Sequence, residues 1–204
     1  VGVAITDTGA VAGDVIVRGV VSVRGENSVG LLVDGQVDGE VRVNGTWVVT
    51  GFRSTSRPAD VSDLDPDDLE SGGAAIHIRD NVLGGVTVEG IGIENDEDDD
   101  GDGVDESDTG GDADDNVTAN IALFGDAPAI FVEADAASGS FVLGANADGF
   151  GLQTRGAVTA NGVYDDFDAT AIRLQGEGGA FVTINGGIAI DNSVGATAFA
   201  SVDD

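Results

Sequence analysis

Ile76-His77-Ile78 stands ten residues ahead of Val86-Thr87-Val88-Glu89-Gly90, and similar pairs of phrases recur at the same offset. The other copies join 31–33 to 41–45 and 172–174 to 182–186. A constant offset in three copies indicates that the chain is a stack of similar units. Such a stack usually presents an extended surface rather than an enzyme pocket.

Composition favours strands throughout the 204 residues. The apolar residues are mainly Val, Ile, Ala and Leu, and there are 33 Gly, no Met and no Cys. β-branched residues and glycine lower helix propensity and suit short strands joined by tight corners. No apolar run approaches the ~20 residues of a membrane-spanning helix. We therefore expect a nearly all-β chain without direct membrane insertion, disulfide bonds or cysteine zinc sites.

Short runs of alternating residues mark the expected strands. In one of them Val41 and Val43 flank Arg42, which places the valines on one face and the arginine on the other. Glycines between the runs supply corners. The expected strands include 15–17, 21–23, 31–33, 41–43, 47–49, 76–78, 86–88, 91–93, 120–123, 130–132, 141–143, 158–160, 172–174, 182–184 and 188–190.

The spacing of the first phrases indicates the architecture. They begin at Leu31, Ile76, Ile130 and Ile172, at intervals of 45, 54 and 42 residues. The phrase at 158–162 matches 182–186 at a spacing of 24, so we expect a coil of that length and two coils per interval. This predicts one domain over 1–204, built as a parallel β-helix, or β-solenoid. A β-sandwich is the alternative, although it does not require recurrent spacing.

Two polar segments interrupt the pattern as expected insertions. The first, 52–73, is a surface loop in which Asp65 and Pro66 predict the start of one helical turn. The second, 94–116, contains 13 acidic residues and no basic residue. A segment of this composition does not join an apolar core. We expect both to leave the stack at its corners.

The net charge of the chain is −30, from 38 acidic and 8 basic residues, and every basic residue is arginine. This charge repels nucleic acid and anionic membranes and attracts cations. We therefore expect no nucleic-acid partner. Solubility alone is the other reading of the same charge.

The second insertion contains a candidate calcium loop. Three aspartates match ligand positions 1, 3 and 5 of an EF-hand-like loop, and they are Asp98, Asp100 and Asp102. Gly103 matches position 6 and Glu106 matches position 9. Position 12 is Thr109, while Asp108 falls one residue early. The match is incomplete, so we expect weak calcium binding, and an acidic loop without metal is the alternative. The candidate ligands are Asp96, Asp98, Asp100, Asp102, Asp105, Glu106 and Asp108.

Other chemistry-bearing residues favour structural roles. His77 is the only histidine, and alternation turns it outward as an exposed strand residue without a nucleophile motif. Three neighbouring carboxylates could flank a sugar, but they also suit an ordinary turn: Asp165, Asp166 and Asp168. Trp47 and Tyr164 stand too far apart for a carbohydrate platform. We expect four phenylalanines in the core or at a cap: Phe131, Phe141, Phe181 and Phe199.

Several phrases resemble the large passenger regions of alphaproteobacterial autotransporter-type surface proteins. They lie at 11–15, 25–30, 51–58 and 161–168, and that family also alternates such phrases with acidic insertions. The resemblance implies a right-handed parallel β-helix displayed at the bacterial cell surface. The chain begins at Val1 without a signal peptide, so we expect a piece of a longer protein.

We expect a non-enzymatic extracellular solenoid that serves adhesion or assembly. The segment from 188–190 to 198–200 shows no charged cap, so open ends can stack copies of the chain into filaments, with calcium as a support. A cap supplied by sequence outside 1–204 is the alternative. A surface or carbohydrate partner is also compatible with this reading. Two alternatives remain open: a polysaccharide-acting β-helix enzyme, such as a lyase, and a simple calcium-binding module.

Overall fold

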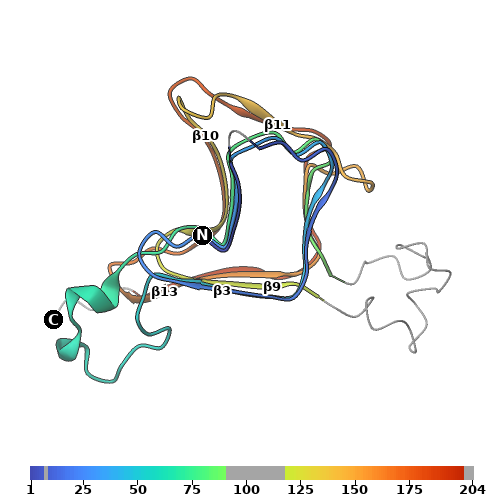
Figure 1. Cartoon of the computed structure of the whole chain (residues 1–204). Coiled ribbons are helices and arrows are strands. Elements are labelled where there is room, and N and C mark those ends of the chain that lie inside the picture. Colours follow the sequence, from blue (N-terminus) through green and yellow to red (C-terminus); the bar gives the residue numbers. More distant parts are fainter. Residues whose placement is uncertain (7–8, 91–117, 200–204) are drawn as a thin grey trace, which may run out of the picture.

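The computed structural model describes residues 1–6, 9–90 and 118–199, and these form one stack of parallel strands (Figure 1). Five coils follow one another along the chain: β1–β3, β4–β6, β7–β9, β10–β13 and β14–β17. Each coil contributes one strand to each of three five-stranded sheets, and all pairings within them are parallel. The predicted parallel β-solenoid is therefore confirmed.

Each sheet makes one face of the stack. The β10 face contains β1 (Val3–Ile5), β4 (Leu31–Val33), β7 (Ile76–Ile78), β10 (Pro128–Ala134) and β14 (Thr170–Gly176). The β12 face contains β2 (Val15–Val17), β5 (Val41–Val43), β8 (Val86–Val88), β12 (Leu152–Thr154) and β16 (Ile188–Ile190). The β13 face contains β3 (Val20–Arg24), β6 (Thr46–Thr50), β9 (Asn120–Phe124), β13 (Ala157–Asp165) and β17 (Val194–Phe199).

A fourth, narrower side closes each coil between the β10 and β12 faces. Among the described residues, only the last two coils form strands there, β11 (Phe141–Leu143) and β15 (Val182–Ile184). Single bridges continue this side through the earlier coils, at Val11, Val37 and Val82. The cross-section of the stack is consequently four-sided (Figure 1).

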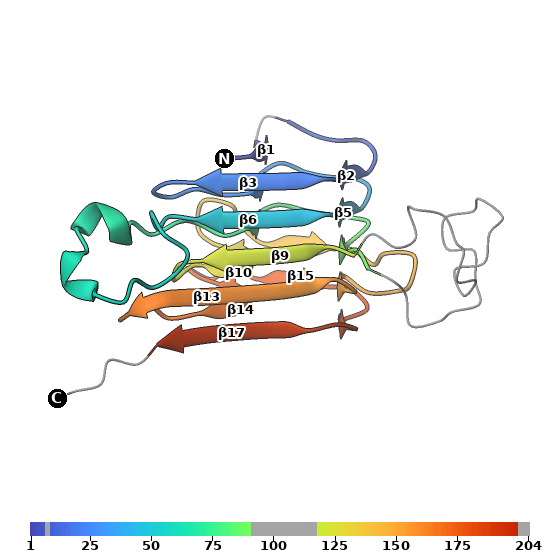
Figure 2. The ribbon, with the colours of Figure 1, turned by 90° about the horizontal axis from the view of Figure 1, so that it is seen from below.

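The coil is right-handed. With the first coil nearest the viewer in Figure 1, the chain runs clockwise from the β10 face over β11 to the β12 face and returns along β9 and β13. Figure 2 shows the later coils following one another along the axis away from the first. A path that turns clockwise while it recedes is right-handed, the usual sense of parallel strand crossovers. The handedness implied by the resemblance is thus the one observed.

Like residues stack in register to form the core. Leu31, Ile76, Ile130 and Ile172 are aligned across four neighbouring strands of the β10 face. In the middle coils these inward side chains are fully buried. Burial of an aliphatic side chain contributes about 1.5–3 kcal/mol, so this apolar column is the main stabilising element of the fold.

The register corrects our count of coils. Leu31, Ile76, Ile130 and Ile172 lie on adjacent coils, so each interval is one coil and not two. The first coil shows the basic length, because Val15 aligns with Val41, 26 residues later. The longer intervals contain segments that leave the stack between strands.

The register also corrects the third copy of the repeat. Val41 pairs with Val86 on the β12 face, but Val182 pairs with Phe141 on the β11 side. The β12-face strand of that coil begins at Ile188 instead. The match at a spacing of 24 was therefore wrong as a measure of the coil, since Val158 lies on the β13 face.

The segment between β6 and β7 packs on the corner beyond β13. It contains two 3-10 helices, η1 (Val61–Asp63) and η2 (Pro66–Leu69). Before η2, the Asp68 carboxylate accepts a hydrogen bond from the Asp65 N–H, at 3.1 Å. Phe52, at the start of this segment, packs with Val163 and Tyr164 in a second apolar cluster. None of the described helices is long and apolar enough to cross a membrane.

Candidate functional site

The outer side of the β10 face carries a stacked column of side chains. Register places Leu32, His77, Phe131 and Arg173 side by side on neighbouring strands. The His77 and Phe131 rings are stacked with centroids 4.8 Å apart, and the Arg173 guanidinium lies 5.6 Å from the Phe131 centroid. Aromatic stacking and cation–π contact therefore link three coils. Phe131 was expected in the core or a cap and instead lies outward.

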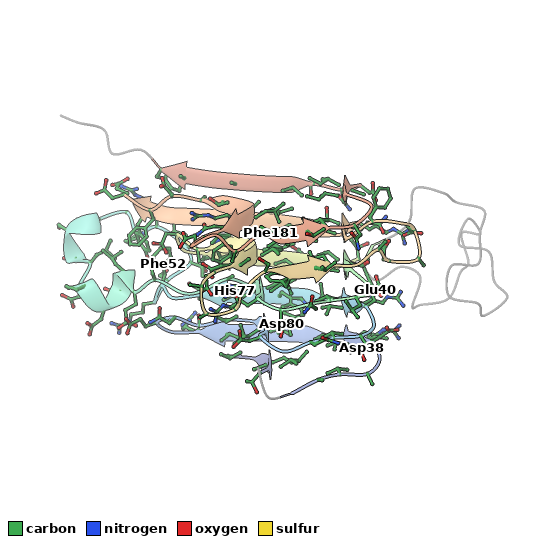
Figure 3. All side chains as sticks on the ribbon, turned by 90° about the horizontal axis from the view of Figure 1, so that it is seen from above. Asp38, Glu40, Phe52, His77, Asp80 and Phe181 are labelled. Carbon is green, nitrogen blue, oxygen red and sulfur yellow. The ribbon has the colours of Figure 1, made fainter. Side chains whose placement is uncertain are left out.

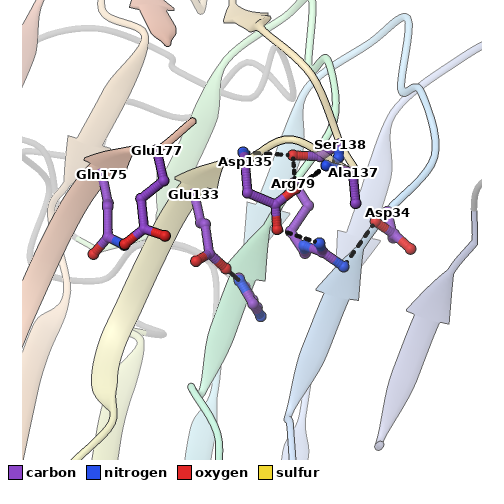
Figure 4. A network of polar contacts seen from close by, with 9 residues as sticks. Asp34, Arg79, Glu133, Asp135, Ala137, Ser138, Gln175 and Glu177 are labelled. Carbon is purple, nitrogen blue, oxygen red and sulfur yellow. Dashed lines mark hydrogen bonds and ion pairs between the residues drawn. The ribbon is translucent and has the colours of Figure 1, made fainter. Parts of the chain in front are cut away.

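Beside this column runs a row of charged contacts (Figure 4). Arg79 reaches Asp135 at 2.8 Å and Asp34 at 3.4 Å, so one guanidinium bridges acids from two other coils. Asp135 also accepts hydrogen bonds from Ala137 N–H, Ser138 N–H and Ser138 Oγ–H. These donors and Arg79 hold the pKa of Asp135 well below its usual range. The row stabilises the stack of coils and its adjoining corner.

His77 is less exposed than we predicted. Its ring is half-buried against Phe131, and its Nε2 lies 3.0 Å from Glu133 Oε2. Burial lowers the pKa of His77, although Glu133 opposes the shift by favouring the imidazolium. His77 is therefore part of a structural network rather than a free strand residue.

Acidification should destabilise the folded chain through His77. Its pKa is lower in the folded than in the unfolded state, so its contribution to stability is present above the unfolded value and is lost as pH falls below it. We expect wild type to lose more free energy of unfolding than His77→Phe between pH 7.5 and 5.5 (about one pH unit either side of the unfolded value near 6.5). Urea unfolding at both pH values measures this. An equal or larger loss in His77→Phe would contradict the assignment.

A second polar network lies on the outer side of the β12 face. Arg42 Nε lies 2.8 Å from Glu89 Oε1 and 3.9 Å from Glu40 Oε2. Thr87 is buried and its hydroxyl donates to Glu40. Burial raises the pKa of Glu40, while Thr87 and Arg42 oppose the rise. The arginine thus neutralises two carboxylates on neighbouring coils.

The loop between β11 and β12 covers this network. Asn146 Nδ2 donates to Thr87 Oγ1 at 3.0 Å and to Gln153 Oε1 at 2.8 Å, while its Oδ1 accepts from Phe150 N–H. Gln153 in turn donates to Asp191 at 2.9 Å. Hydrogen bonds therefore link these side chains across three coils. Such mutual satisfaction of polar groups is typical of a structural network.

Two of the three candidate carboxylates near β13 lie in structural surroundings, an ion pair and a turn. Asp165 forms a two-bond ion pair with Arg57, with both distances 2.7 Å, and so ties the 52–73 segment to β13. This pairing lowers the pKa of Asp165. Asp166 has a positive φ of 66° immediately after the strand, as in a turn. Tyr164 donates its hydroxyl to Ser54 O at 3.0 Å, and Trp47 lies fully buried in the core.

The first and the last described coil each have a neighbouring coil on one side only. In the last coil the inward residues Leu174, Ile188 and Ile190 are 41%, 41% and 56% exposed, whereas Ile130 in the preceding coil is fully buried. The first coil leaves its inward residues only partly covered as well. Each end coil also has one unpaired edge along its described strands. These ends are the candidate assembly surfaces.

Two phenylalanines expected in the core or a cap lie on the last coil. Phe181 is 62% exposed at the start of the β15 side (Figure 3), and Phe199 is also exposed at the end of β17. Phe141, one coil earlier, is buried as expected. Phe181 differs because Val182, and not Phe181, aligns with Phe141, so Phe181 alternates outward, while Phe199 lies on the last coil.

The candidate calcium ligands lie outside the described residues, and so does the strand expected at 91–93. They are Asp96, Asp98, Asp100, Asp102, Asp105, Glu106 and Asp108. Their flanking residues are described: Ala119 N–H donates to Glu89 O at 2.9 Å, at the corner between the β12 and β13 faces. Within 1–6, 9–90 and 118–199, no group of three acidic or histidine side chains is placed to hold a metal ion.

Comparison with known proteins found no match for this chain. No family model, no curated protein and no solved structure matches this chain. The architecture alone defines its class, a right-handed parallel β-solenoid with polar networks on its outer faces.

Proposed function

We propose that the chain is a non-enzymatic structural and adhesive β-solenoid that acts outside the cell, and that its ends join copies into filaments. The open last coil carries this proposal, because it combines exposed inward apolar residues with an unpaired edge. Both features favour addition of further strands. The outer networks join charged and polar side chains to one another, which suits a stable rod.

Display at a bacterial cell surface is the setting we propose. The resemblance of the phrases at 11–15, 25–30, 51–58 and 161–168 to autotransporter passengers supports it. The charge of −30 and the absence of cysteine are compatible with an exported, highly solvated rod. The same charge favours a positively charged surface as the adhesion partner. An acidic carbohydrate could also bind if metal ions bridge its charges to those of the chain.

Electron microscopy and sedimentation velocity of the purified 204-residue chain test the proposal. We expect rods that lengthen with protein concentration, both in EDTA and with calcium added. Monomers at every concentration under both conditions would overturn self-assembly. Incubation of the chain with acidic polysaccharides, followed by the ultraviolet absorbance of unsaturated products, tests for lyase activity. A steady rise in this absorbance would overturn the non-enzymatic assignment.

Ile190→Glu should weaken assembly strongly. The side chain of Ile190 belongs to the inward-facing row of the last coil and is more than half exposed. Contact between two copies at this coil would therefore bury it. A carboxylate at this place would have to be desolvated, and we expect the concentration for half-assembly to rise at least roughly tenfold. The matched control is Ala189→Glu, whose side chain alternates outward on the same strand. Equal effects of the two variants would count against a joint through the inward row.

Calcium is proposed as a support bound by the acidic insertion. Crowded carboxylates repel one another without a cation, and oxygen ligands at alternate positions suit calcium. We expect Asp100→Asn combined with Asp102→Asn to weaken calcium binding by about tenfold or more in a calorimetric titration. Asp60→Asn with Asp63→Asn, in the other insertion, is the charge-matched control. Unchanged binding in the first variant would remove these residues from the ligand set.

A further inference from the structure

The outer side of the β13 face differs in charge from the outer sides of the other two sheets. The other sheets carry ion pairs there, such as Arg79 with Asp34 and Arg42 with Glu89. On the β13 face, the third outward row contains Arg24, at its first strand. The first two outward rows of its described strands contain no charged residue, and they are Val20, Thr46, Asn120 and Ala157, then Ser22, Val48, Ala122, Thr159 and Gly195. A chain with a net charge of −30 thus has one neutral face.

The residues of these two rows are small and leave the sheet open. Thr46 and Asn120 are exposed, and Val48 and Ala122 stay partly exposed although each lies between two neighbouring strands. Figure 2 looks onto this face and shows its five strands side by side, with the 52–73 segment at one end of them. Apolar and hydroxyl side chains without charge are typical of the centre of an interface, where charged residues are depleted.

The charge pattern indicates which partner this face fits. A cationic partner gains electrostatic attraction on the acidic parts of the chain, and a neutral face offers it none. A second copy of the chain carries the same negative charge, so most approaches of two copies bring like charges together. Among the three sheets, the β13 face is the one on which two copies meet with few charges between them. Its neutrality therefore favours a partner with the same charge as the chain itself.

We propose that two copies of this chain pair laterally, with their β13 faces packed against each other like the two sheets of a β-sandwich. Sheets that pack face to face lie about 10 Å apart, a distance at which side chains from both sheets meet. The same surface serves both copies, so the interface has a two-fold axis. The inference goes beyond the proposed end-to-end assembly, because it uses a side of the stack that further coils would lengthen and not cover.

The 52–73 segment determines the direction of the two-fold axis. This segment projects past the β13 face at one end of its strands (Figures 1 and 2). An axis along the strands would bring the segments of both copies to the same end, whereas an axis along the stack places them at opposite ends. The axis along the stack keeps the two segments apart and leaves both stacks pointing the same way. With this axis over the middle outward row, Ala122 of one copy faces Ala122 of the other.

The size of the face predicts reversible pairing. Five strands about 4.8 Å apart, which share a length of five residues at about 3.3 Å each, give a patch of roughly 20 by 16 Å per copy. Such a patch is at the small end of specific interfaces. We expect a dimer that depends on protein concentration. Added salt should tighten it, because salt screens the repulsion between the acidic parts of the two copies.

Sedimentation velocity of Ile190→Glu tests lateral pairing by itself, because this change is expected to weaken the proposed end-to-end contact. We expect dimers of this variant at high protein concentration. Adding Ala122→Glu should raise the dissociation constant at least roughly tenfold, since two carboxylates would then face each other. The control is Ala4→Glu, which makes the same change at an outward position of the β10 face and should stay within about threefold.

A mixing experiment tests the symmetry of the interface. Chains with Ala122→Glu should pair with chains that carry Ala122→Arg, because residue 122 of one copy meets residue 122 of the other. The chain has no cysteine of its own, so single cysteines provide a second check. A short bis-maleimide should link Ala122→Cys chains into dimers, while Ala4→Cys chains should remain unlinked.

The outcomes separate lateral pairing from the proposed end-to-end assembly. Monomers of Ile190→Glu at every protein and salt concentration would overturn lateral pairing, and so would equal losses of dimer in Ala122→Glu and Ala4→Glu. Wild-type rods in the same experiments would leave the end-to-end contact standing. Wild-type chains that stop at dimers would overturn the end-to-end contact and support lateral pairing.

Discussion

Replacing Phe52 with alanine should destabilise the folded chain by about 3–5 kcal/mol, the usual cost of removing a fully buried aromatic ring. Phe52 is fully buried, and its ring meets Tyr164 and Phe167 edge-on with centroids 4.9 Å away in both cases. Edge-to-face pairs of this kind add to the stabilisation from buried area. The ring is the main apolar contact between the first insertion and the corner beyond β13, so its loss should also release that insertion.

Two measurements separate these effects. Urea unfolding gives the free energy, and limited trypsin digestion reports release of the insertion, because Arg53 and Arg57 lie within it. We expect faster cleavage there in Phe52→Ala than in wild type. The control is Phe181→Ala, which removes an equal ring from an exposed position and should change stability by less than about 0.5 kcal/mol. A similar loss in both variants would contradict a docking role for Phe52.

Alternation predicted the strands, and the recurrence of similar phrases at a fixed offset predicted that the strands stack. Residues such as Val41-Arg42-Val43 and Ile76-His77-Ile78 form strands with inward ends and an outward centre. The interior is filled mainly by aligned aliphatic residues, and this is why the strands were predictable.

The number of residues per coil was not predictable in the same way. A triplet on the β11 side resembles one on the β12 face, since both need the same inward apolar residues. Val182–Ile184 therefore looked like another copy of Val41–Val43, although it pairs with Phe141–Leu143. Only the register distinguishes the two sides, because corners of variable length separate them along the chain.

The outer networks were also beyond sequence reasoning. Arg79 meets Asp135 across 56 residues, and Arg42 meets Glu89 across 47, so no local spacing links these pairs. Alternation did indicate that these residues face outward. The observed register places Glu89, Arg155 and Asp191 in one column of alternating charge, which the predicted coil length of 24 residues did not align.

Gly45→Ala should be a strongly destabilising single-methyl change at a corner of the coil. Gly45 has a φ of +79°, which strains a residue with a side chain, and an added Cβ would lie 2.0 Å from Gly19 O and 2.8 Å from Gly19 C. The obstacle is backbone of the neighbouring coil, and Gly45 O also accepts the Asn120 N–H from the coil on the other side. Relief therefore requires the first coils to move apart. Strain and overpacking together should cost roughly 2–6 kcal/mol.

Gly19→Ala is the matched control for the steric part of this loss. Gly19 occupies the same corner one coil earlier, has a φ of +109°, and an added Cβ there would meet no atom within 4 Å. Both variants place a side chain at a strained positive φ, but only in Gly45→Ala does the added methyl group also clash with the backbone of the neighbouring coil. Urea unfolding of the two variants, at a concentration where both are monomeric, should show the larger loss in Gly45→Ala. Equal losses would mean that conformational strain, and not the close approach of adjacent coils, requires glycine at this corner.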